Sequence, residues 1–254
     1  MNEEHLQVNL SGKTAIVTGG SRGIGKAIAF AMAGAGANVV VASRTEDDSA
    51  TLPGTIYKTV EEIRNLGGVT TPVRCDVTKA DEVKRMVETT LNTYGKIDIL
   101  VNNAGVINNA NFMDTDITAF TNIWQVNVLG PFLCTQAVLP GMMARKSGNI
   151  VSIASGLAES THPTYNIYSA SKAALSRMMV KLAAEVADYN IAVNVLSPGG
   201  IRSEGMIAIS TDELLSRLPP PTIIGPPILW LAAQDAKSFT GKVVQVNKFG
   251  IEWP

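Results

Sequence analysis

Short apolar runs rich in β-branched residues recur along this chain, and most of the segments between them are long enough for one helix. Most of these runs are continuously apolar rather than alternating, as expected for strands that are buried on both faces of a parallel sheet. They occupy residues 13–19, 38–43, 69–75, 96–102, 149–155 and 191–197. We therefore predict strands at these positions and a last strand at residues 242–246.

The intervening segments carry apolar residues at helical spacing. The predicted helices cover residues 25–33, 59–66, 81–94, 116–143 and 168–189, with a shorter one near 228–233. This alternation predicts an α/β fold, a Rossmann-type doubly wound parallel sheet of about seven strands with right-handed crossovers and helices on both faces. Because the chain has 254 residues and no repeat or low-complexity linker, we expect residues 1–254 to form a single domain.

Two segments, residues 45–55 and 199–227, fit neither pattern. The second contains proline clusters and follows a predicted strand at its carboxyl end, where open α/β sheets bind ligands. We expect it to form a loop or lid on the substrate side. The first lengthens the connection after the second strand, and the sequence assigns it no role.

The composition argues against several classes of function. A net charge of -1 and an isoelectric point of about 6.1 provide no broad cationic surface for nucleic acid or anionic lipid. The only cysteines are Cys75 and Cys134 and the only histidines are His5 and His162, so we expect neither a disulfide framework nor a metal site. The first ten residues show no signal-peptide pattern and no apolar run reaches the length of a bilayer span, which predicts a soluble cytoplasmic protein with no membrane partner.

A glycine-rich turn directly follows the first predicted strand. Gly19, Gly23 and Gly25 are spaced Gly-x-x-x-Gly-x-Gly and precede a predicted helix. Glycine lets the backbone approach a pyrophosphate closely, and the helix N-terminus offers free N–H groups and a positive dipole end to the same anion. The turn alone would also fit an ordinary strand-to-helix connection, but its placement predicts a dinucleotide site.

Together with further motifs, this turn resembles that of the classical short-chain dehydrogenase/reductase family over nearly the whole chain. The motifs are Asp76 after the third strand, Asn102-Asn103-Ala104-Gly105 after the fourth, Asn127, Ser155, the run from Tyr168 to Lys172, and Pro198-Gly199 after the sixth. The resemblance implies a nicotinamide cofactor. It would be contacted by Gly19, Ser21, Arg22, Gly23, Ile24, Gly25, Ser43, Arg44, Asp76, Val77, Asn103, Ala104, Gly105, Tyr168, Lys172, Pro198, Gly199, Ile201 and Ser203.

The end of the second predicted strand bears on the choice of cofactor. An acidic residue about 20 positions beyond the glycine turn would bind the ribose 2′-hydroxyl of NAD and repel a 2′-phosphate. Ser43 and Arg44 stand there instead, and Arg22 lies in the glycine turn. Two guanidinium groups favour a phosphate, so we predict NADP(H) as the preferred cofactor, with NAD(H) as the alternative. The competing interpretation is that Arg44 only pairs with a surface carboxylate such as that of Glu46.

Tyr168 and Lys172 lie four residues apart at the start of a predicted helix, so their side chains share one face. A free tyrosine hydroxyl, with a pKa of about 10, is a poor base at neutral pH, and nearby positive charge lowers that pKa. We expect Lys172, together with the charge of an oxidised nicotinamide, to lower the pKa of Tyr168 and make it the general acid/base. By the resemblance, Lys172 also holds the nicotinamide ribose.

Two further residues complete the expected catalytic set. Ser155 is expected to donate a hydrogen bond to the substrate oxygen, with Ser152 as the competing candidate. By the resemblance, Asn127 holds a water that links Lys172 to solvent as a proton relay.

The predicted activity is NADP-dependent interconversion of a secondary alcohol and a ketone or oxoacyl group on a small molecule. A nucleotide-binding regulator or scaffold on the same fold is the main alternative, and a non-redox lyase or epimerase is a third. Residues 156–167, with His162 as a candidate contact, and residues 199–227 should wall an apolar or mixed pocket. The two longest predicted helices would leave apolar surface exposed, which predicts a homotetramer, with a dimer as the alternative.

Overall fold

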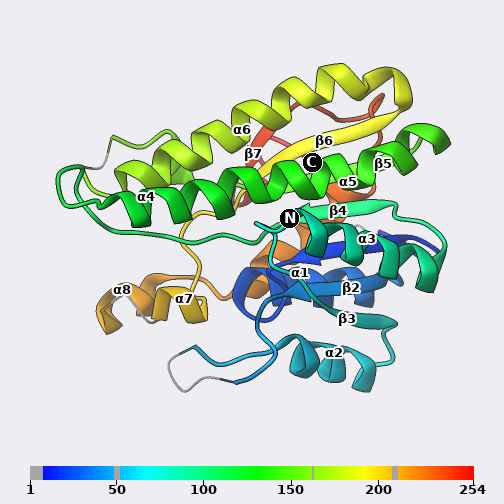
Figure 1. Cartoon of the computed structure of the whole chain (residues 1–254), viewed down its shortest axis with the longest axis horizontal. Coiled ribbons are helices and arrows are strands. Elements are labelled where there is room, and N and C mark those ends of the chain that lie inside the picture. The colour runs from blue at the N-terminus through cyan, green and yellow to red at the C-terminus, as the bar shows by residue number, and fades with distance from the viewer. Residues whose placement is uncertain (1–7, 49–51, 162, 208–210) are drawn as a thin grey trace.

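The sheet has the predicted architecture. The computed structural model describes residues 8–48, 52–161, 163–207 and 211–254. Seven parallel strands lie in the order β3-β2-β1-β4-β5-β6-β7 (Figure 1). They are β1 Thr14–Thr18, β2 Asn38–Ser43, β3 Thr70–Arg74, β4 Ile99–Asn102, β5 Gly148–Ile153, β6 Ile191–Ser197 and β7 Val243–Gln245.

Helices connect the strands as the apolar spacing predicts. They are α1 Gly23–Gly34, α2 Ile56–Asn65, α3 Ala80–Tyr94, α4 Ile117–Trp124, α5 Gly130–Arg145, α6 Asn166–Val186, α7 Glu204–Ile207, α8 Asp212–Arg217 and α9 Gly225–Ala232. Local capping explains several ends: Thr55 accepts a hydrogen bond from the Lys58 N–H at the start of α2, and Gly95 ends α3 with φ +77°.

Two hydrophobic layers fill the space between sheet and helices. In β1, Ala15 and Val17 face the layer under α1, α2 and α9, whereas Ile16 faces the layer under α3, α5 and α6. All three side chains are fully buried, and burial of a large apolar side chain contributes about 1.5–3 kcal/mol. The fold class predicted from continuous apolar runs is therefore confirmed.

The helix predicted at residues 116–143 forms, but its hydrogen-bond pattern changes in the middle. The chain forms α4, then a π-helical turn at Gln125–Leu129, then α5. Pro131 lies in the first turn of α5 and lacks the N–H that a regular α-helix would donate to the carbonyl of Asn127. The wider turn places Asn127 at the site described below, as π-bulges often do.

The continuous helical stretch Ile117–Arg145 also bears on the membrane prediction. By length and mean hydropathy alone this helical stretch could cross a bilayer. It contains polar residues, so it is not one of the continuous apolar runs considered in the sequence. A core helix of a soluble protein passes the same test, and 44% of the most apolar window is buried inside the molecule. Cys134, Val138 and Met142 of α5 pack in the layer under the sheet.

Residues 199–227 are more regular than the sequence suggested. They include α7, α8 and a 3-10 turn at Pro221–Ile224, and α9 begins at Gly225 rather than near residue 228. Pro226 and Pro227 occupy the first turn of α9, where a missing N–H costs nothing. Two prolines of a segment that was expected to form a loop or lid thus lie at the start of a helix.

The strand order reverses between β1 and β4, so the connections leaving these strands diverge to opposite sides. Open α/β sheets bind ligands at such a switch point, outside the carboxyl ends of the strands. The glycine turn follows β1 and residues 103–105 follow β4. The fold therefore brings two of the predicted motifs to one place.

Candidate active site

The glycine turn leaves no room for side chains. Gly19 has φ +66°, and a β-carbon there would lie 2.9 Å from the Cα atom of Ala104. A β-carbon at Gly25 would lie 2.2 Å from the carbonyl oxygen of Gly19. Helix α1 begins here with no side-chain cap on its first N–H groups. These groups and the bare backbone form a cradle that fits a pyrophosphate.

Hydrogen bonds lock this turn to the end of β4. The Asn103 side chain donates to the carbonyls of Thr18 (2.8 Å) and Gly19 (3.1 Å). The Thr18 hydroxyl accepts hydrogen bonds from the backbone N–H groups of Asn103 (3.0 Å) and Ala104 (3.1 Å). The sequence analysis placed Asn103 in the cofactor cleft but missed Thr18, whose only signal is a hydroxyl residue at the strand end before the glycines.

A cavity of about 580 Å³ opens over the turn. Most of the predicted cofactor residues line it: Gly19, Ser21, Arg22, Gly23, Ile24, Gly25, Ser43, Arg44, Asp76, Val77, Asn103, Ala104, Gly105 and Ser203. The sequence analysis missed five others, which are Thr45, Leu52, Cys75, Val106 and Val126. Leu52 and Thr45 belong to the segment to which the sequence assigned no role.

A second cavity, of about 540 Å³, continues from the first and shares Ile24, Asn103, Gly105, Val106 and Ser203 with it. It brings together the remaining predicted residues except Asn127, which lines neither cavity: Ser155, Tyr168, Lys172, Pro198, Gly199 and Ile201. Its outer wall is largely apolar and includes Leu157, Met206, Leu214 and Leu218. His162, the candidate contact, and Ile209, which belongs to the predicted wall segment 199–227, lie outside the described residues.

Tyr168 and Ser155 face this second cavity together. Burial raises the pKa of Tyr168, and a hydrogen bond with Ser155 lowers it in part. The net shift in the chain without a cofactor is upward, whereas the sequence analysis expected positive charge from Lys172 and an oxidised nicotinamide to lower this pKa. The physical reason is that desolvation of the buried phenolate outweighs the favourable contacts present.

Lys172 lies almost fully buried beside the tyrosine. Its ammonium is 5.9 Å from the centroid of the Tyr168 ring and donates a 2.8 Å hydrogen bond to the carbonyl of Ile153 at the end of β5. Burial lowers the pKa of Lys172 to about 8. No carboxylate forms an ion pair with this ammonium among the residues that the structure describes.

The two candidate serines have different environments. Ser152 is fully buried within β5, and its hydroxyl accepts a hydrogen bond from the Asn102 side chain (3.2 Å). Ser155 lies beyond the strand end and lines the second cavity, and its hydroxyl oxygen accepts a hydrogen bond from the Leu157 N–H (3.2 Å). The Ser155 hydroxyl thus faces the cavity and hydrogen-bonds Tyr168, whereas the Ser152 hydroxyl is buried away from it, which favours Ser155 over Ser152.

The side chain of Asn127 is engaged with protein groups. Its amide donates to the Val106 carbonyl (2.9 Å) and the Ser171 hydroxyl (3.0 Å), and its oxygen accepts from the Val106 N–H (2.9 Å). A β-carbon at Gly105 would lie 3.4 Å from both Asn127 Oδ1 and Lys172 Nζ, so the three residues adjoin. The structure thus gives Asn127 a fixing role for the Val106 loop; the predicted water relay stays a prediction.

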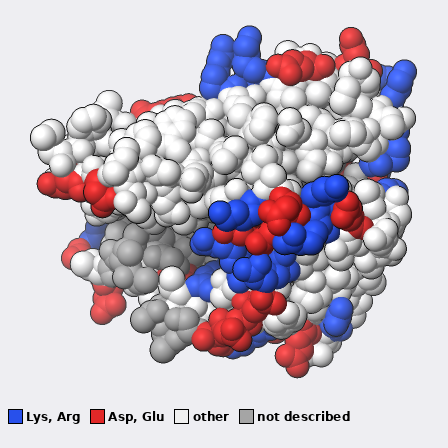
Figure 2. Space-filling view, viewed as in Figure 1, with Lys and Arg blue, Asp and Glu red and all other residues white. Residues whose placement is uncertain are grey.

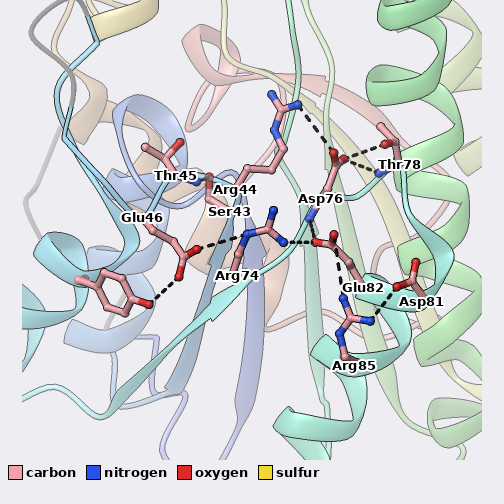
Figure 3. Close-up of polar contacts among 11 residues, drawn as sticks. Ser43, Arg44, Thr45, Glu46, Arg74, Asp76, Thr78, Asp81, Glu82 and Arg85 are labelled. Carbon is pink, nitrogen blue, oxygen red and sulfur yellow. Dashed lines mark hydrogen bonds and ion pairs between the residues drawn. The ribbon is translucent and has the colours of Figure 1, made fainter.

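Polar side chains surround the nucleotide end of the first cavity (Figure 3). Asp76 lies 3.9 Å from the Arg44 guanidinium and accepts hydrogen bonds from the Thr78 N–H (3.0 Å) and hydroxyl (2.8 Å). Burial raises the pKa of Asp76, but the Thr78 hydrogen bonds and the Arg44 charge together lower it by more. The net shift of this pKa is therefore downward. Arg44 therefore pairs, at some distance, with Asp76 rather than with Glu46.

Nothing in the described part of the chain gathers three or more His, Cys, Asp or Glu side chains into a group that could hold a metal ion. Burial raises the pKa of the Cys75 thiol to about 12, so this cavity-lining sulfur stays protonated at neutral pH.

The comparisons with known proteins identify the family. The family model for short chain dehydrogenases matches residues 13–214. The chain belongs to the short-chain dehydrogenase/reductase family. This confirms the resemblance on which the site residues were chosen.

Several relatives of this short-chain dehydrogenase are similar over nearly their whole length. The 3-oxoacyl-[acyl-carrier-protein] reductase of Staphylococcus epidermidis is 34% identical over 92% of this chain and 97% of its own. A structure of 7α-hydroxysteroid dehydrogenase with NADH and 7-oxo glycochenodeoxycholic acid has a TM-score of 0.86 at 32% identity and covers 94% of each chain. A Beutenbergia cavernae structure assigned to an NAD(P)-dependent gluconate 5-dehydrogenase, with NADP bound at low occupancy, has a TM-score of 0.84 at 30% identity, covering 94% of this chain and 97% of its own.

This short-chain dehydrogenase is accordingly an NAD(P)-dependent oxidoreductase that interconverts an alcohol and a ketone. The alternative of a regulator or scaffold on the same fold is not favoured.

Proposed function

We propose that Tyr168 is the general acid/base of this oxidoreductase, that Ser155, Lys172 and Asn127 support it, and that NADP(H) is the preferred cofactor. The observation that carries the catalytic part is the convergence of Ser155, Tyr168 and Lys172 in the second cavity, which shares part of its wall with the first. One cavity has the glycine cradle of a dinucleotide site and the other has an apolar outer wall. A reaction between a cofactor and a small molecule requires such a junction.

The cofactor supplies a hydride to the carbonyl carbon in reduction and accepts one in oxidation. Tyr168 gives its proton to the carbonyl oxygen in reduction and takes it back in oxidation. Its raised pKa keeps the hydroxyl protonated at neutral pH, which suits proton donation. Ser155 donates a hydrogen bond to the same oxygen, which orients the carbonyl and stabilises the charge that develops on it.

Lys172 and Asn127 are assigned supporting roles. Lys172 would hold the nicotinamide ribose, and its ammonium, already fixed by Ile153, supplies positive charge beside the tyrosine. Asn127 holds the Val106 loop that borders both cavities.

The preference for NADP(H) is supported by the charges around Ser43. Arg22, Arg44 and Ser43 line the first cavity, and its only carboxylate among the described residues is that of Asp76, which faces Arg44. Position 43 carries a serine hydroxyl in place of the carboxylate that would repel a 2′-phosphate there. Relatives with NADH and with NADP are both known, so the family alone does not decide the cofactor.

The substrate is proposed to be a small molecule whose reacting end carries the carbonyl and whose remainder is largely apolar. Leu157, Met206, Leu214 and Leu218 support this assignment because they form the outer wall of the second cavity. We further propose that the chain is one domain that works in the cytoplasm without membrane or nucleic-acid partners, in keeping with its net charge of -1.

A homotetramer is proposed as the working assembly, with a dimer as the alternative. Figure 2 shows a broad surface over α4 and α5 with few charged side chains. Large apolar side chains are exposed there: Ile117 (75%), Phe120 (37%), Leu129 (40%) and Phe132 (43%). Such a patch favours burial against another subunit.

Adding a panel of ketones, oxoacyl thioesters, sugars and steroids to the protein with NADPH or NADH tests the proposal. Loss of absorbance of the reduced nicotinamide with a ketone, faster with NADPH than with NADH at equal low concentration, is the expected result. Equal efficiency with both cofactors would contradict the NADP(H) assignment but not the reaction.

A further inference from the structure

The segment between β2 and α2 folds back onto the glycine turn. Its described residues are 45–48 and 52–55. The Ile56 N–H donates to the Thr45 carbonyl (3.0 Å), and the Gly54 N–H donates to Asp48 Oδ1 (2.6 Å). The two ends of the segment are therefore tied to each other.

Gly54 makes the contact with the turn. It has φ +111°, and a β-carbon there would lie 2.7 Å from the carbonyl oxygen of Ser21 and 3.2 Å from Cβ of Arg22. Both the backbone conformation and the close approach require glycine. A tight contact of this kind fixes the segment against the residues that begin the cofactor site.

This contact positions the guanidinium of Arg22. Nη2 of Arg22 donates to the Gly54 carbonyl (3.2 Å) and to the Thr45 hydroxyl (3.3 Å). These two bonds account for both protons on Nη2, and a guanidinium has three further N–H donors. The segment thus holds one edge of the guanidinium and leaves the rest for another acceptor.

The charge of Arg22 is not neutralised by its neighbours. Both of its acceptors are uncharged, and no ion pair joins it to a carboxylate within the described ranges. By contrast, Arg44 faces Asp76, and Arg74 lies between Glu46 (3.3 Å) and Glu82 (2.9 Å). Arg22 lines the first cavity, so its cationic group borders the cofactor site.

Two carboxylates of the segment, those of Glu46 and Asp48, bind other groups. Glu46 accepts a hydrogen bond from the Tyr57 hydroxyl (2.7 Å) and pairs with Arg74, and Figure 3 shows its carboxylate turned toward that arginine. Asp48 binds the Gly54 N–H and lies 3.8 Å from the Lys58 ammonium. Glu46 and Asp48, two acidic residues close in sequence to Ser43 and Arg44, are therefore bound to groups other than Arg22.

From these contacts we infer that Gly54 and Thr45 are positioning residues that aim the Arg22 guanidinium at the 2′-phosphate of the cofactor. Thr45 and Gly54, which belong to the segment to which the sequence assigned no role, then determine the preference for NADP(H). This inference rests on the proposed NADP(H) preference. The new element is that cofactor selectivity depends on Thr45 and Gly54, which bind the Arg22 guanidinium.

The test compares Gly54→Ala with Gly67→Ala. Gly67 also has a positive φ, +84°, but a β-carbon there meets nothing within 4 Å, so its substitution strains the backbone without touching the turn. Dissociation constants of NADPH, NADH, 2′,5′-ADP and 5′-AMP are measured for each protein. Gly54→Ala is expected to weaken binding of NADPH and 2′,5′-ADP by about tenfold and binding of NADH and 5′-AMP by less than about threefold, because a displaced guanidinium loses a charge-assisted bond to phosphate.

Gly67→Ala is expected to leave the ratio of NADPH to NADH affinity unchanged. Equal weakening of all four ligands by Gly54→Ala, or no weakening, would overturn the inference. Thr45→Val provides a second test should Gly54→Ala fail to fold, because it removes one of the two acceptors of Arg22 Nη2 and keeps the shape of the side chain. It is expected to lower the ratio by a few-fold, and an unchanged ratio would again overturn the inference.

Arg22→Met separates this inference from the proposed function. If Arg22→Met leaves the ratio of NADPH to NADH affinity unchanged, the assignment of Arg22 to the 2′-phosphate fails. If Arg22→Met lowers the ratio while Gly54→Ala and Thr45→Val do not, only the positioning role fails.

Discussion

The ammonium of Lys172 lies 5.9 Å from the centroid of the Tyr168 ring, and burial acts on the two groups in opposite directions. It lowers the pKa of Lys172 to about 8 and raises the pKa of Tyr168. Desolvation thus favours the neutral form of both groups in the chain alone. The pair is held in this geometry by the Ile153 carbonyl and the Ser155 hydroxyl at the end of β5.

Burial of Lys172 should make stability depend on pH. The folded-state pKa, about 8, is below the ordinary value of 10.5, so between these values the unfolded chain binds more protons and the free energy of unfolding rises with pH. Relative to Lys172→Met, the unmodified protein should gain stability on the order of 2 kcal/mol from pH 8 to 10.5. Urea unfolding of both proteins without added cofactor measures this, and parallel pH profiles would show that the ammonium is not desolvated.

Replacing Ser155 and Ser152 by alanine, one at a time, distinguishes a catalytic hydroxyl from a structural one. Ser155→Ala should lower kcat by about a hundredfold with little change in cofactor affinity, because its hydrogen bond goes to the substrate oxygen. Ser152→Ala should leave kcat within a few-fold and cost about 1 kcal/mol of stability, because its partner is the buried Asn102 amide. Steady-state kinetics with a responsive ketone check both, and the opposite pattern would reassign the substrate contact to Ser152.

Arg44→Asp should erase or reverse the preference for NADPH over NADH. The substitution removes a guanidinium from the cavity and places a carboxylate where it repels a 2′-phosphate and accepts a bond from a 2′-hydroxyl. Lys84→Asp is the matched control, since it makes the same charge change on an exposed side chain of α3. The ratio of kcat/KM for the two cofactors is the measurement, and an equal fall of the ratio in both variants would point to overall charge instead of a specific contact.

Sedimentation at micromolar concentration tests the proposed assembly. A species of about four chains is expected because the exposed apolar side chains on α4 and α5 favour burial against a partner. Phe132→Asp and Leu129→Asp together should shift the distribution toward smaller species. A monomer in the unmodified protein would show that these faces do not associate.

The fold could be predicted from sequence because burial of a strand on both faces leaves a continuous apolar run, as in β1. The cavity residues could be predicted because glycines and short polar motifs follow the strand ends. The π-helical turn at Asn127 and the contact of Gly54 with Ser21 could not, because they depend on how distant segments pack. The direction of the Tyr168 pKa shift was also missed, since desolvation depends on burial and the sequence showed only the neighbouring lysine.

The kinetics of Tyr168→Phe test the central claim most directly. The substitution removes one hydroxyl and keeps the ring, so fold and cofactor affinity should be retained while kcat for a responsive ketone falls by about a hundredfold to ten-thousandfold. The oxidation of NADPH is followed by its absorbance, with circular dichroism and cofactor titration on the same samples. A folded, cofactor-binding Tyr168→Phe protein with near-normal kcat would contradict the assignment of Tyr168 as the general acid/base.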